Sequence, residues 1–359
     1  MKASVVRGFG QGFELADIDI AMPIGCEVLV DVRASGLCHS DESASTRPLG
    51  GEPPMVLGYE VAGIVAAIGP DVTEVKVGDH VVGCLVRNCG SCKRCAAGKP
   101  TLCLNPGFTE RGSEQPLRLT ESGTPVAQGL GVGGFAQQVL LHEHQIAVIP
   151  DELPWPQAAL LGCGVITGAG AVLNTANVQP SDVVVVIGAG GVGLNALNGA
   201  VTAGAATLVA IDIADEKLER ARRFGATHVI NSVKKDPVEA VRVITGVGAD
   251  AVFDFVGVSP ITPQALQIVA PGGGLYLAGL LDNSVTLSVS PTELLATKRR
   301  IVGVYMGDTI AKRDIPRYAE LYLQGRFELD ELVSLADVQA GYSQLKDPDV
   351  ARVVITDFA

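Results

Sequence analysis

Cysteines at four close positions make the strongest local motif in this sequence: Cys89, Cys92, Cys95 and Cys103, separated by two, two and seven residues. Four thiolates at such spacing can complete a tetrahedron around Zn²⁺, which is typical of a structural site. The alternatives are an iron–sulfur cluster, although nothing after this lobe resembles a ferredoxin, and a group of free thiols. We therefore expect structural zinc, in a reducing compartment such as the cytoplasm.

A second motif, Gly188-Ala189-Gly190-Gly191-Val192-Gly193, matches the pattern G-x-G-x-x-G. It follows a run of valines and precedes a helical pattern, which is the context that a dinucleotide-binding loop needs. The first glycine permits a tight turn, the second lets the backbone approach a pyrophosphate, and the third lets the helix pack on the strand. The N–H groups at the start of the helix then face the phosphates. On its own, the motif also fits a glycine-rich turn in any α/β protein.

Asp212 favours the dinucleotide interpretation, because it ends the next strand, 19 positions after Gly193. A carboxylate at this place accepts hydrogen bonds from both ribose hydroxyls. The same charge repels a 2′-phosphate, and no arginine adjoins Asp212. We therefore expect a site that binds NAD in preference to NADP.

The elements that carry these residues change character along the chain. In the first third, short apolar runs at 28–34, 60–68 and 80–86 end in Gly, Pro or Asp, as short strands do. Residues 106–134 are rich in Gly, Pro, Ser and Thr, and they predict a long loop. Two amphipathic segments, 315–324 and 338–345, precede a closing strand at 351–355.

From residue 181 to residue 278, strands and helices alternate strictly, which predicts a parallel, doubly wound α/β sheet. The expected strands are 181–187, 208–211, 228–230, 251–255 and 275–278. The expected helices are 191–203, 215–224, 237–245 and 263–270.

The composition is that of a globular protein, with 47% hydrophobic and 18% charged residues. A length of 359 residues allows two domains with separate cores. The net charge of −12 argues against nucleic acid or an anionic membrane as a partner. Long apolar stretches are interrupted by glycine, and the first residues lack the apolar core of a signal peptide. We expect neither a membrane nor a nucleic-acid partner.

Taken together, the sequence resembles the zinc-containing medium-chain alcohol dehydrogenases over essentially its whole length. The resemblance rests on segments 36–41, 58–60 and 161–164, on the four-cysteine lobe, on the glycine loop with Asp212, and on Arg352. The long 106–134 segment is most similar to the class I/III and aryl-alcohol branch.

The resemblance implies an α/β protein with two domains that forms a homodimer or homotetramer. A mainly β, GroES-like catalytic domain would comprise 1–164, with a structural zinc lobe at 84–105, and 301–359. A doubly wound Rossmann domain that binds NAD would comprise 165–300.

In that family a catalytic zinc ion binds two cysteines and a histidine and acts on the alcohol as a Lewis acid. The matching positions here are Cys38, Cys163 and Tyr59, so a phenol stands where the histidine would be. Ser40 matches the residue that relays the hydroxyl proton, and Glu60 matches a carboxylate behind the metal.

The resemblance also assigns residues to the cofactor and to the neighbourhood of the metal. Asp41 matches the carboxylate that orients the missing histidine. The cofactor residues are His39 and Arg352 at the pyrophosphate, Thr167 and Val192 at the nicotinamide, Lys217 near the adenosine ribose, and Gly188, Gly190, Gly191 and Gly193 with Asp212. The histidine that ends the proton relay in class I enzymes would fall at Ser43, so protons must leave by another route.

Tyr59 leaves three states of this site open. A phenol has a pKa of about 10 and must lose its proton to become a good ligand, although a bound cation favours that loss. Tyrosinate ligates zinc beside Cys38 and Cys163, or Glu60 becomes the third ligand, or the metal is absent and Tyr59 donates a proton. The remaining alternative is that Cys38 and Cys163 only pack against their neighbours.

We therefore expect an NAD-dependent oxidoreductase that transfers a hydride between NAD(H) and a primary or aromatic alcohol or aldehyde. A variant of this function holds NAD(H) so tightly that it needs an added electron acceptor. The first alternative is a zinc-independent NAD(P)H reductase of activated C=C or C=N bonds, with Tyr59 as proton donor. The second alternative is a protein that binds the cofactor without catalysis.

Overall fold

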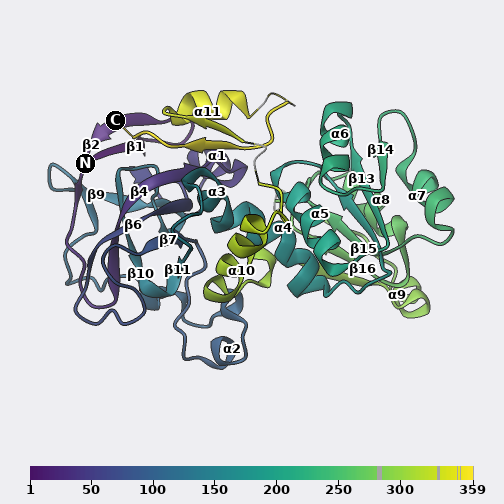
Figure 1. Ribbon diagram of the computed structural model, residues 1–359, viewed down its shortest axis with the longest axis horizontal. Coiled ribbons are helices and arrows are strands. Elements are labelled where there is room, and N and C mark those ends of the chain that lie inside the picture. Colours follow the sequence, from purple (N-terminus) through teal and green to yellow (C-terminus); the bar gives the residue numbers. More distant parts are fainter. Residues whose placement is uncertain (281–284, 330–331, 346, 348, 359) are drawn as a thin grey trace. The chain divides into compact units, whose positions relative to one another are not determined.

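The structure is a computed structural model that describes all residues except 281–284, 330–331, 346, 348 and 359 (Figure 1). It divides into two compact units, which we call the first unit (Met1–Cys163 with Thr309–Ala359) and the second unit (Gly164–Asp308). The second predicted boundary, at residue 300, is too early. Strand β17 (Arg300–Gly303) pairs with β16 (Val269–Leu277) and therefore stays with the second unit.

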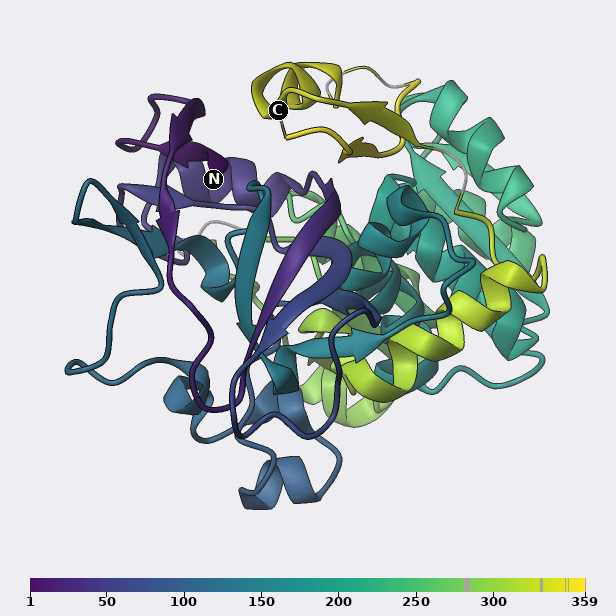
Figure 2. The same ribbon diagram turned by 60° about the vertical axis from the view of Figure 1, so that its left-hand side comes forward.

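The larger sheet of the first unit positions the cysteine and tyrosine segments. Its strand order is β11-β7-β6-β4-β19-β18, and β10 also pairs with β4. The bounds are β4 (Glu27–Gly36), β6 (Glu60–Ile68), β7 (His80–Gly83), β10 (Gln138–His142), β11 (Ile146–Val148), β18 (Val333–Leu335) and β19 (Val353–Ile355). Figure 2 shows β4 between β6 and β10. Because Gly36 pairs with Glu60, the residues that follow β4 and precede β6 lie together.

The other sheet of the first unit has the order β2-β1-β5-β9-β8-β3. Its bounds are β1 (Lys2–Val6), β2 (Glu14–Asp17), β3 (Asp19–Ile20), β5 (Met55–Val56), β8 (Leu119–Glu121) and β9 (Thr124–Gln128). The hairpin β8–β9 lies within 106–134, so the prediction of an uninterrupted loop was wrong there. Leu119 and Val126 are buried and hold the hairpin, and Ser122 and Gly123 turn it with positive φ.

A buried carboxylate fixes the rest of that long segment. Glu27, at the start of β4, is 4% exposed and accepts hydrogen bonds from Arg111 Nε at 2.9 Å and Arg118 Nε at 2.8 Å. Both arginine side chains are also largely buried. Such an ion pair is costly to break, because the remaining charge would be left without a partner.

Five α-helices in the described part of the first unit are short or lie at the edges of its sheets. They are α1 (His39–Thr46), α2 (Lys93–Ala96), α3 (Trp155–Leu160), α10 (Ala311–Leu323) and α11 (Val338–Gln344). An apolar core beneath α1 and α11 includes Leu37, Phe135 and Tyr342. This core carries the segment that begins at Cys38.

The second unit confirms the predicted parallel, doubly wound sheet, with the strand order β14-β13-β12-β15-β16-β17. Its other strands are β12 (Val183–Ile187), β13 (Thr207–Asp212), β14 (His228–Asn231) and β15 (Ala249–Asp254). Its α-helices are α4 (Ile166–Gly170), α5 (Gly191–Ala203), α6 (Asp215–Arg223), α7 (Pro237–Thr245), α8 (Ile261–Ile268) and α9 (Pro291–Thr297). Strand β12 lies between β13 and β15, so the loop after it opens at the point where strand order reverses, where such folds bind ligands.

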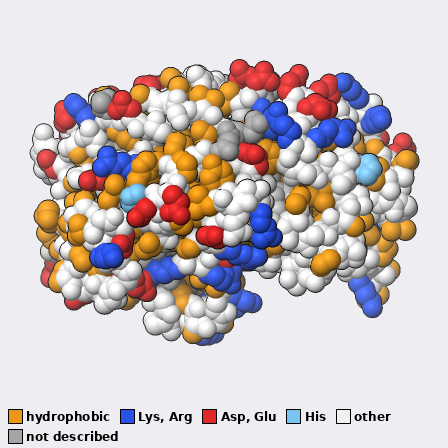
Figure 3. All heavy atoms as spheres, in the orientation of Figure 1, with side chains coloured by type: hydrophobic (Ala, Val, Ile, Leu, Met, Phe, Trp, Pro, Cys, Tyr) orange, Lys and Arg blue, Asp and Glu red, His pale blue; other side chains and the backbone are white. Residues whose placement is uncertain are grey.

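One helical stretch, Trp155–Ala176, is long and apolar enough to cross a membrane by length and composition. Within its most apolar window, 78% is buried inside the protein, as in the core helix of a globular protein. On the face drawn in Figure 3, Lys and Arg side chains lie among Asp and Glu side chains. Exposed pairs of this kind contribute little to stability.

Candidate functional site

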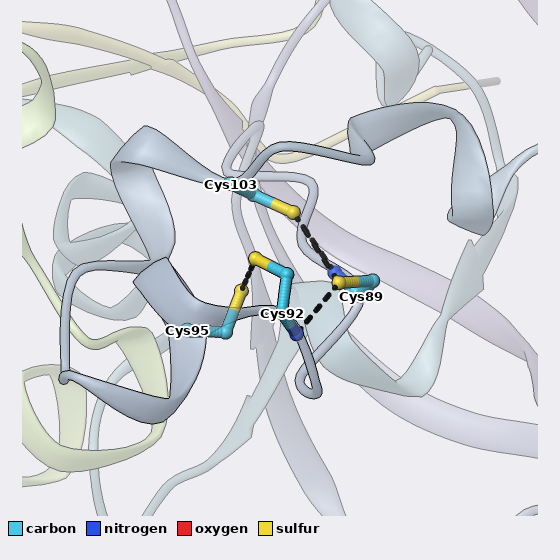
Figure 4. A group of neighbouring side chains, drawn as sticks. All are labelled: Cys89, Cys92, Cys95 and Cys103. Atoms are coloured by element: carbon cyan, nitrogen blue, oxygen red, sulfur yellow. Dashed lines mark hydrogen bonds between the residues drawn. The ribbon is translucent and has the colours of Figure 1, made fainter.

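The four predicted zinc ligands converge in a lobe between β7 and β8. Cys92 precedes α2, Cys95 lies within it, and Cys103 follows a short 3-10 turn. The Sγ atoms of Cys92 and Cys95 are 3.5 Å apart, and those of Cys89 and Cys103 are 3.6 Å apart. All four Sγ atoms lie within 4.8 Å of one another (Figure 4). Zn–S bonds of about 2.3 Å place ligand sulfurs at nearly this separation, so the cluster fits a closed zinc site.

Backbone N–H groups prepare these thiols for a metal. The N–H of Cys92 donates to Cys89 Sγ at 3.4 Å, and the N–H of Asn105 donates to Cys103 Sγ at 3.3 Å. Donors from Cys92 and Ser91 lower the pKa of the Cys89 thiol to about 6. Burial raises the pKa of Cys95 to about 12, and a bound cation would displace that proton. The lobe is therefore a structural zinc site without an open position.

Cys38, Tyr59 and Cys163 form a chain of hydrogen bonds within the first unit. The Tyr59 hydroxyl donates to Cys38 Sγ at 2.8 Å, and the Cys163 thiol donates to the Tyr59 oxygen at 3.4 Å. Tyr59 is 2% exposed and Cys163 is 5% exposed, while Cys38 is half-buried. The phenol oxygen therefore lies between the two sulfurs.

The groups around Cys38 favour its thiolate. The neighbouring Cys163 thiol, the charge of Arg352 and the Tyr59 hydroxyl hold the pKa of the Cys38 thiol well below its ordinary value, although burial opposes them. Burial and the neighbouring Cys163 and Cys38 raise the pKa of Tyr59 well above its ordinary value. In this arrangement Cys38 is the acceptor at the end of the chain, and Tyr59 keeps its proton.

Glu60 lies beside the two cysteines and is completely buried. Its Oε2 atom is paired with Nη2 of Arg352, which is also buried. Its Oε1 atom has no hydrogen-bond partner among the described residues, and burial raises the pKa of Glu60 to about 7. A side chain at Gly36 would overlap the Glu60 carboxylate, so this close approach requires glycine. The resemblance placed Arg352 at the pyrophosphate, and the structure adds this ion pair.

Asp41 is the second buried carboxylate near Tyr59. Its Oδ1 atom accepts a hydrogen bond from the N–H of Gly58 at 2.9 Å. Its Oδ2 atom has no partner within the described part of the chain. This is the residue that the family resemblance gives the task of orienting a histidine, and Tyr59 supplies no N–H group to it.

These side chains fit a zinc ion by their chemistry. The ligand atoms of Cys38, Glu60 and Cys163 lie within 4.8 Å of one another. Two thiols and a carboxylate are donors that Zn²⁺ binds, and the Oε1 atom of Glu60 is a buried acceptor without a partner. The Tyr59 oxygen is a fourth candidate donor.

The glycine loop of the second unit joins β12 to α5. Gly188 has a φ of +93°, which a residue with a side chain rarely adopts. A Cβ atom on Gly193 would overlap the carbonyl oxygen of Gly188, so the helix can approach the strand only with glycine here. A Cβ atom on Gly190 would meet nothing within 4 Å. Open space in front of Gly190 fits a pyrophosphate against the backbone.

Asp212, at the end of β13, holds this loop. Its Oδ2 atom accepts a hydrogen bond from the N–H of Ala189 at 2.8 Å, and its Oδ1 atom accepts one from the N–H of Ile213 at 2.7 Å. Oδ1 also accepts a hydrogen bond from the N–H of Ala214 at 3.1 Å, so the second lone pair of Oδ2 is the one left for a ribose hydroxyl. Lys217 is half-buried in the following helix α6.

The family models that match the chain and its known relatives indicate the same protein family. The model described as alcohol dehydrogenase GroES-like domain matches residues 25–151, and the model described as zinc-binding dehydrogenase matches residues 191–324. A putative alcohol dehydrogenase D of Mycobacterium tuberculosis is 35% identical, over 98% of both chains. An NDMA-dependent alcohol dehydrogenase of Amycolatopsis methanolica is also 35% identical, over 99% of this chain and 98% of that relative. This chain belongs to the zinc-containing medium-chain alcohol dehydrogenases.

A solved structure supports this membership. The crystal structure of benzyl alcohol dehydrogenase from Acinetobacter calcoaceticus has a TM-score of 0.93 and 34% sequence identity, and it covers 99% of both chains. The protein is therefore an oxidoreductase of the alcohol dehydrogenase type, with the predicted GroES-like and Rossmann folds.

The remaining predicted residues of this alcohol dehydrogenase lie in both units. His39 is exposed at the start of α1, and Ser40, half-buried behind it, has a backbone N–H that also favours the Cys38 thiolate. Thr167 and Val192 lie on the adjoining helices α4 and α5, where a Cβ atom on Gly168 would overlap the carbonyl oxygen of Val192.

Sequence reasoning missed Tyr342. Its hydroxyl donates to the carbonyl oxygen of Cys38 at 3.2 Å, although the two residues are 304 positions apart. The residues around Tyr342 in the sequence indicate only an amphipathic segment, so no local pattern could predict its hydrogen bond to Cys38.

Proposed function

We propose that the chain transfers a hydride between NAD(H) and a primary or aromatic alcohol or aldehyde, at a centre formed by Cys38, Tyr59, Glu60 and Cys163. The observation that carries the proposal is the convergence of two cysteines, a protonated phenol and an unpaired carboxylate oxygen in one buried cluster. Groups of such different acidity so close together are typical of a catalytic centre.

A catalytic zinc ion would be held by Cys38 and Cys163, with Glu60 or Tyr59 as the third protein ligand. Zinc bound there would supply Lewis-acid polarisation of the alcohol oxygen. The chain's own residues prepare this centre in advance. Arg352 pairs with Oε2 of Glu60, and Oε1 has no partner among the described residues, so it is available to a metal. The groups around Cys38 favour its thiolate form before any metal binds.

The cofactor proposal rests on the loop 188–193 and on Asp212. The open space in front of Gly190 supports pyrophosphate binding, and the carboxylate of Asp212 supports NAD over NADP. We assign Thr167 and Val192 to the nicotinamide, Lys217 to the adenosine ribose, and His39 and Arg352 to the pyrophosphate. Ser40 would relay the proton of the alcohol.

The preference for primary or aromatic alcohols is supported by one similar protein. The benzyl alcohol dehydrogenase of known structure is similar over almost the whole chain. The relative from Amycolatopsis is described as NDMA-dependent, so an added electron acceptor belongs in any activity assay. Tightly held NAD(H) would then appear as cofactor that remains bound through gel filtration.

A second candidate function is favoured by the protonated Tyr59. Without a catalytic metal, the phenol is placed to give its proton to a substrate while hydride reduces an activated C=C or C=N bond. In that case Cys38 and Cys163 serve Tyr59 as hydrogen-bond partners.

Zinc per chain, measured by elemental analysis on protein purified without added metal, separates the two candidates. About two zinc ions per chain would support alcohol oxidation at a loaded Cys38–Cys163 site. About one would assign the metal to the four-cysteine lobe and favour the zinc-free reductase. NADH formation from a panel of alcohols, with and without an added electron acceptor, must exceed that of a Cys38→Ser control for the proposed alcohol oxidation to hold.

We also propose a homodimer or homotetramer in the cytoplasm. Strand β17 lies at the edge of its sheet, and the exposed apolar residues Leu295 and Tyr305 lie near it in sequence. An open strand edge of this kind readily pairs with a second copy. None of the eight cysteines, all of which the structure describes, forms a disulfide, and this supports a reducing compartment. Analytical ultracentrifugation would give the subunit number.

A further inference from the structure

The carbonyl group of Cys38 receives an unusual hydrogen bond from the far end of the chain. Helix α1 begins after Cys38, and the N–H of Asp41 donates to the Cys38 oxygen at 3.0 Å, as in any helix start. The hydroxyl of Tyr342, in α11, donates to the same oxygen at 3.2 Å. Tyr342 is 3% exposed and Cys38 is half-buried, so this hydrogen bond is partly shielded from solvent.

Aromatic packing fixes the ring of Tyr342. It stacks on Phe13 with ring centroids 5.3 Å apart and an angle of 16° between the planes. Phe13 in turn meets Phe135 edge to face at 5.9 Å. Phe135 packs on Gly58, where a Cβ atom would lie only 2.6 Å from the Phe135 ring. The row of three rings therefore joins α11 to the residue just before Tyr59.

The residue before Cys38 is held from the same side. The N–H of Leu37 donates to the carbonyl oxygen of Val353 in β19 at 2.9 Å. A Cβ atom on Gly341 would lie 2.7 Å from the Leu37 side chain, so α11 passes directly over it. The peptide group before Leu37 and the peptide group after Cys38 are thus anchored by the C-terminal segment.

The side chain of Cys38 takes no part in capping α1, and its backbone is extended, with φ −120° and ψ 144°. Its direction therefore depends on the peptide planes on either side. The Tyr342 bond fixes the plane after Cys38, and the Val353 bond fixes the strand end before it. The fixed peptide plane after Cys38 and the fixed strand end before it together set the direction in which the Cys38 Sγ atom points at the Tyr59 hydroxyl.

We propose that Tyr342 is a positioning residue for Cys38, which aims the thiol at Tyr59 and Cys163 through a hydrogen bond to the Cys38 carbonyl group. This inference rests on the proposed catalytic role of Cys38. The role of Tyr342 is carried by its hydroxyl group, since a phenylalanine would retain the stacking on Phe13.

Tyr342→Phe tests this inference, and Tyr318→Phe is its matched control. Tyr318 is also a fully buried tyrosine, stacked on Phe327 at 5.5 Å, and its hydroxyl has no hydrogen-bond partner among the described residues. Each change removes one buried hydroxyl and keeps a stacked ring. Only Tyr342→Phe removes a bond to the Cys38 segment.

The first readout is the rate at which iodoacetamide alkylates Cys38, followed by peptide mass spectrometry on the full-length protein. We expect alkylation several-fold faster in Tyr342→Phe than in wild type, because the thiol is no longer held, and an unchanged rate in Tyr318→Phe. The second readout is steady-state kinetics. We expect kcat to fall about fivefold to tenfold, the loss of about one hydrogen bond, with the KM for NAD unchanged.

Equal alkylation rates and equal kcat in Tyr342→Phe and wild type would overturn the inference. Equal changes in both variants would also overturn it, because they would indicate a general loss of packing. The alkylation rate needs neither substrate nor metal, so it still tests Tyr342 if no alcohol is oxidised. That outcome would instead count against the proposed function.

Discussion

The hydroxyl of Tyr59 donates a 2.8 Å hydrogen bond to Sγ of Cys38. The bond joins the residue just before β6 to a residue just after β4, the two strands that pair at Gly36 and Glu60. A phenol at this place reaches the sulfur, and the Oδ2 atom of Asp41 has no partner among the residues that the structure describes. Where the family resemblance implies a histidine, Tyr59 therefore affects two contacts.

Tyr59→His should increase both zinc content and alcohol oxidation. An imidazole can ligate zinc through one nitrogen and donate from the other to Asp41, which supplies the missing partner. Tyr59→Phe, the control, keeps the ring and removes the oxygen; for the zinc-free candidate, in which Tyr59 is the proton donor, we expect at least a 100-fold loss of kcat for the reduction of a C=C or C=N bond, typical for a missing proton-transfer group. Zinc per chain and alcohol-dependent NADH formation would be compared for the three proteins. Lower zinc in Tyr59→His than in wild type would contradict the prediction.

Two alanine substitutions in the glycine loop should affect two different properties, the stability of the protein and its affinity for NADH. Gly193→Ala should lower stability, because its Cβ atom would overlap the Gly188 carbonyl oxygen. Gly190→Ala should fold normally and bind NADH at least tenfold more weakly, because its Cβ atom fills the open space where the pyrophosphate would lie. Thermal unfolding and NADH fluorescence titration would measure both effects. Wild-type NADH affinity in Gly190→Ala would show that the loop is not the phosphate site.

Asp212→Asn should relax the discrimination between NADH and NADPH. The amide keeps an acceptor oxygen for the loop and removes the charge that repels a 2′-phosphate. We expect the Kd for NADPH to fall about tenfold while the Kd for NADH rises, both measured by titration. Asp215→Asn, on the exposed start of α6, is the control for a general loss of negative charge. A similar effect of both changes would argue against a specific role of Asp212.

Glu27→Gln should destabilise the first unit in a pH-dependent way. Burial raises the pKa of Glu27, but Arg111 and Arg118 outweigh it and hold that pKa below its ordinary value. Because the folded-state pKa is lowered, the stabilisation is present above the unfolded pKa of about 4.3 and is lost as the pH falls through the folded value. We expect a loss of about 3 kcal/mol at pH 7 that shrinks below pH 4.

Urea unfolding of wild type and Glu27→Gln, at about pH 7 and at about pH 3.5, would measure the difference in the free energy of unfolding at each pH. Asp17→Asn breaks the exposed pair with Lys2, and we expect no measurable change from it. A loss in Glu27→Gln that is the same at both pH values would mean that the charge of Glu27 is not what stabilises the segment.

Local patterns predicted the elements and the motifs that depend on neighbouring residues. Helices α5 and α7 begin and end at the predicted residues, because glycine or proline marks their starts and glycine their ends. The four cysteines converge because their short spacing leaves them little freedom. The hairpin β8–β9 was missed because its buried residues, Leu119 and Val126, are few among turn-forming neighbours.

Contacts between distant parts of the chain could not be predicted from local sequence patterns. The Glu60–Arg352 pair spans 292 positions, and the Tyr342–Cys38 bond spans 304. Each requires the register of β19 against β4, which brings Ile355 opposite Ser35. Residue types alone indicate that a buried carboxylate needs a cation, but they do not indicate which cation supplies it.

The first unit is built from both ends of the chain, and this has a consequence for synthesis on the ribosome. Cys38, Tyr59 and Cys163 emerge early, but Arg352 and Tyr342 emerge only with the last residues, after the whole second unit. Until then Glu60 has no cation, and Cys38 lacks one of its hydrogen-bond donors. The nascent protein therefore carries an unfinished, thiol-rich centre until Arg352 has been synthesised, and a premature stop before Tyr342 would release the chain in that state.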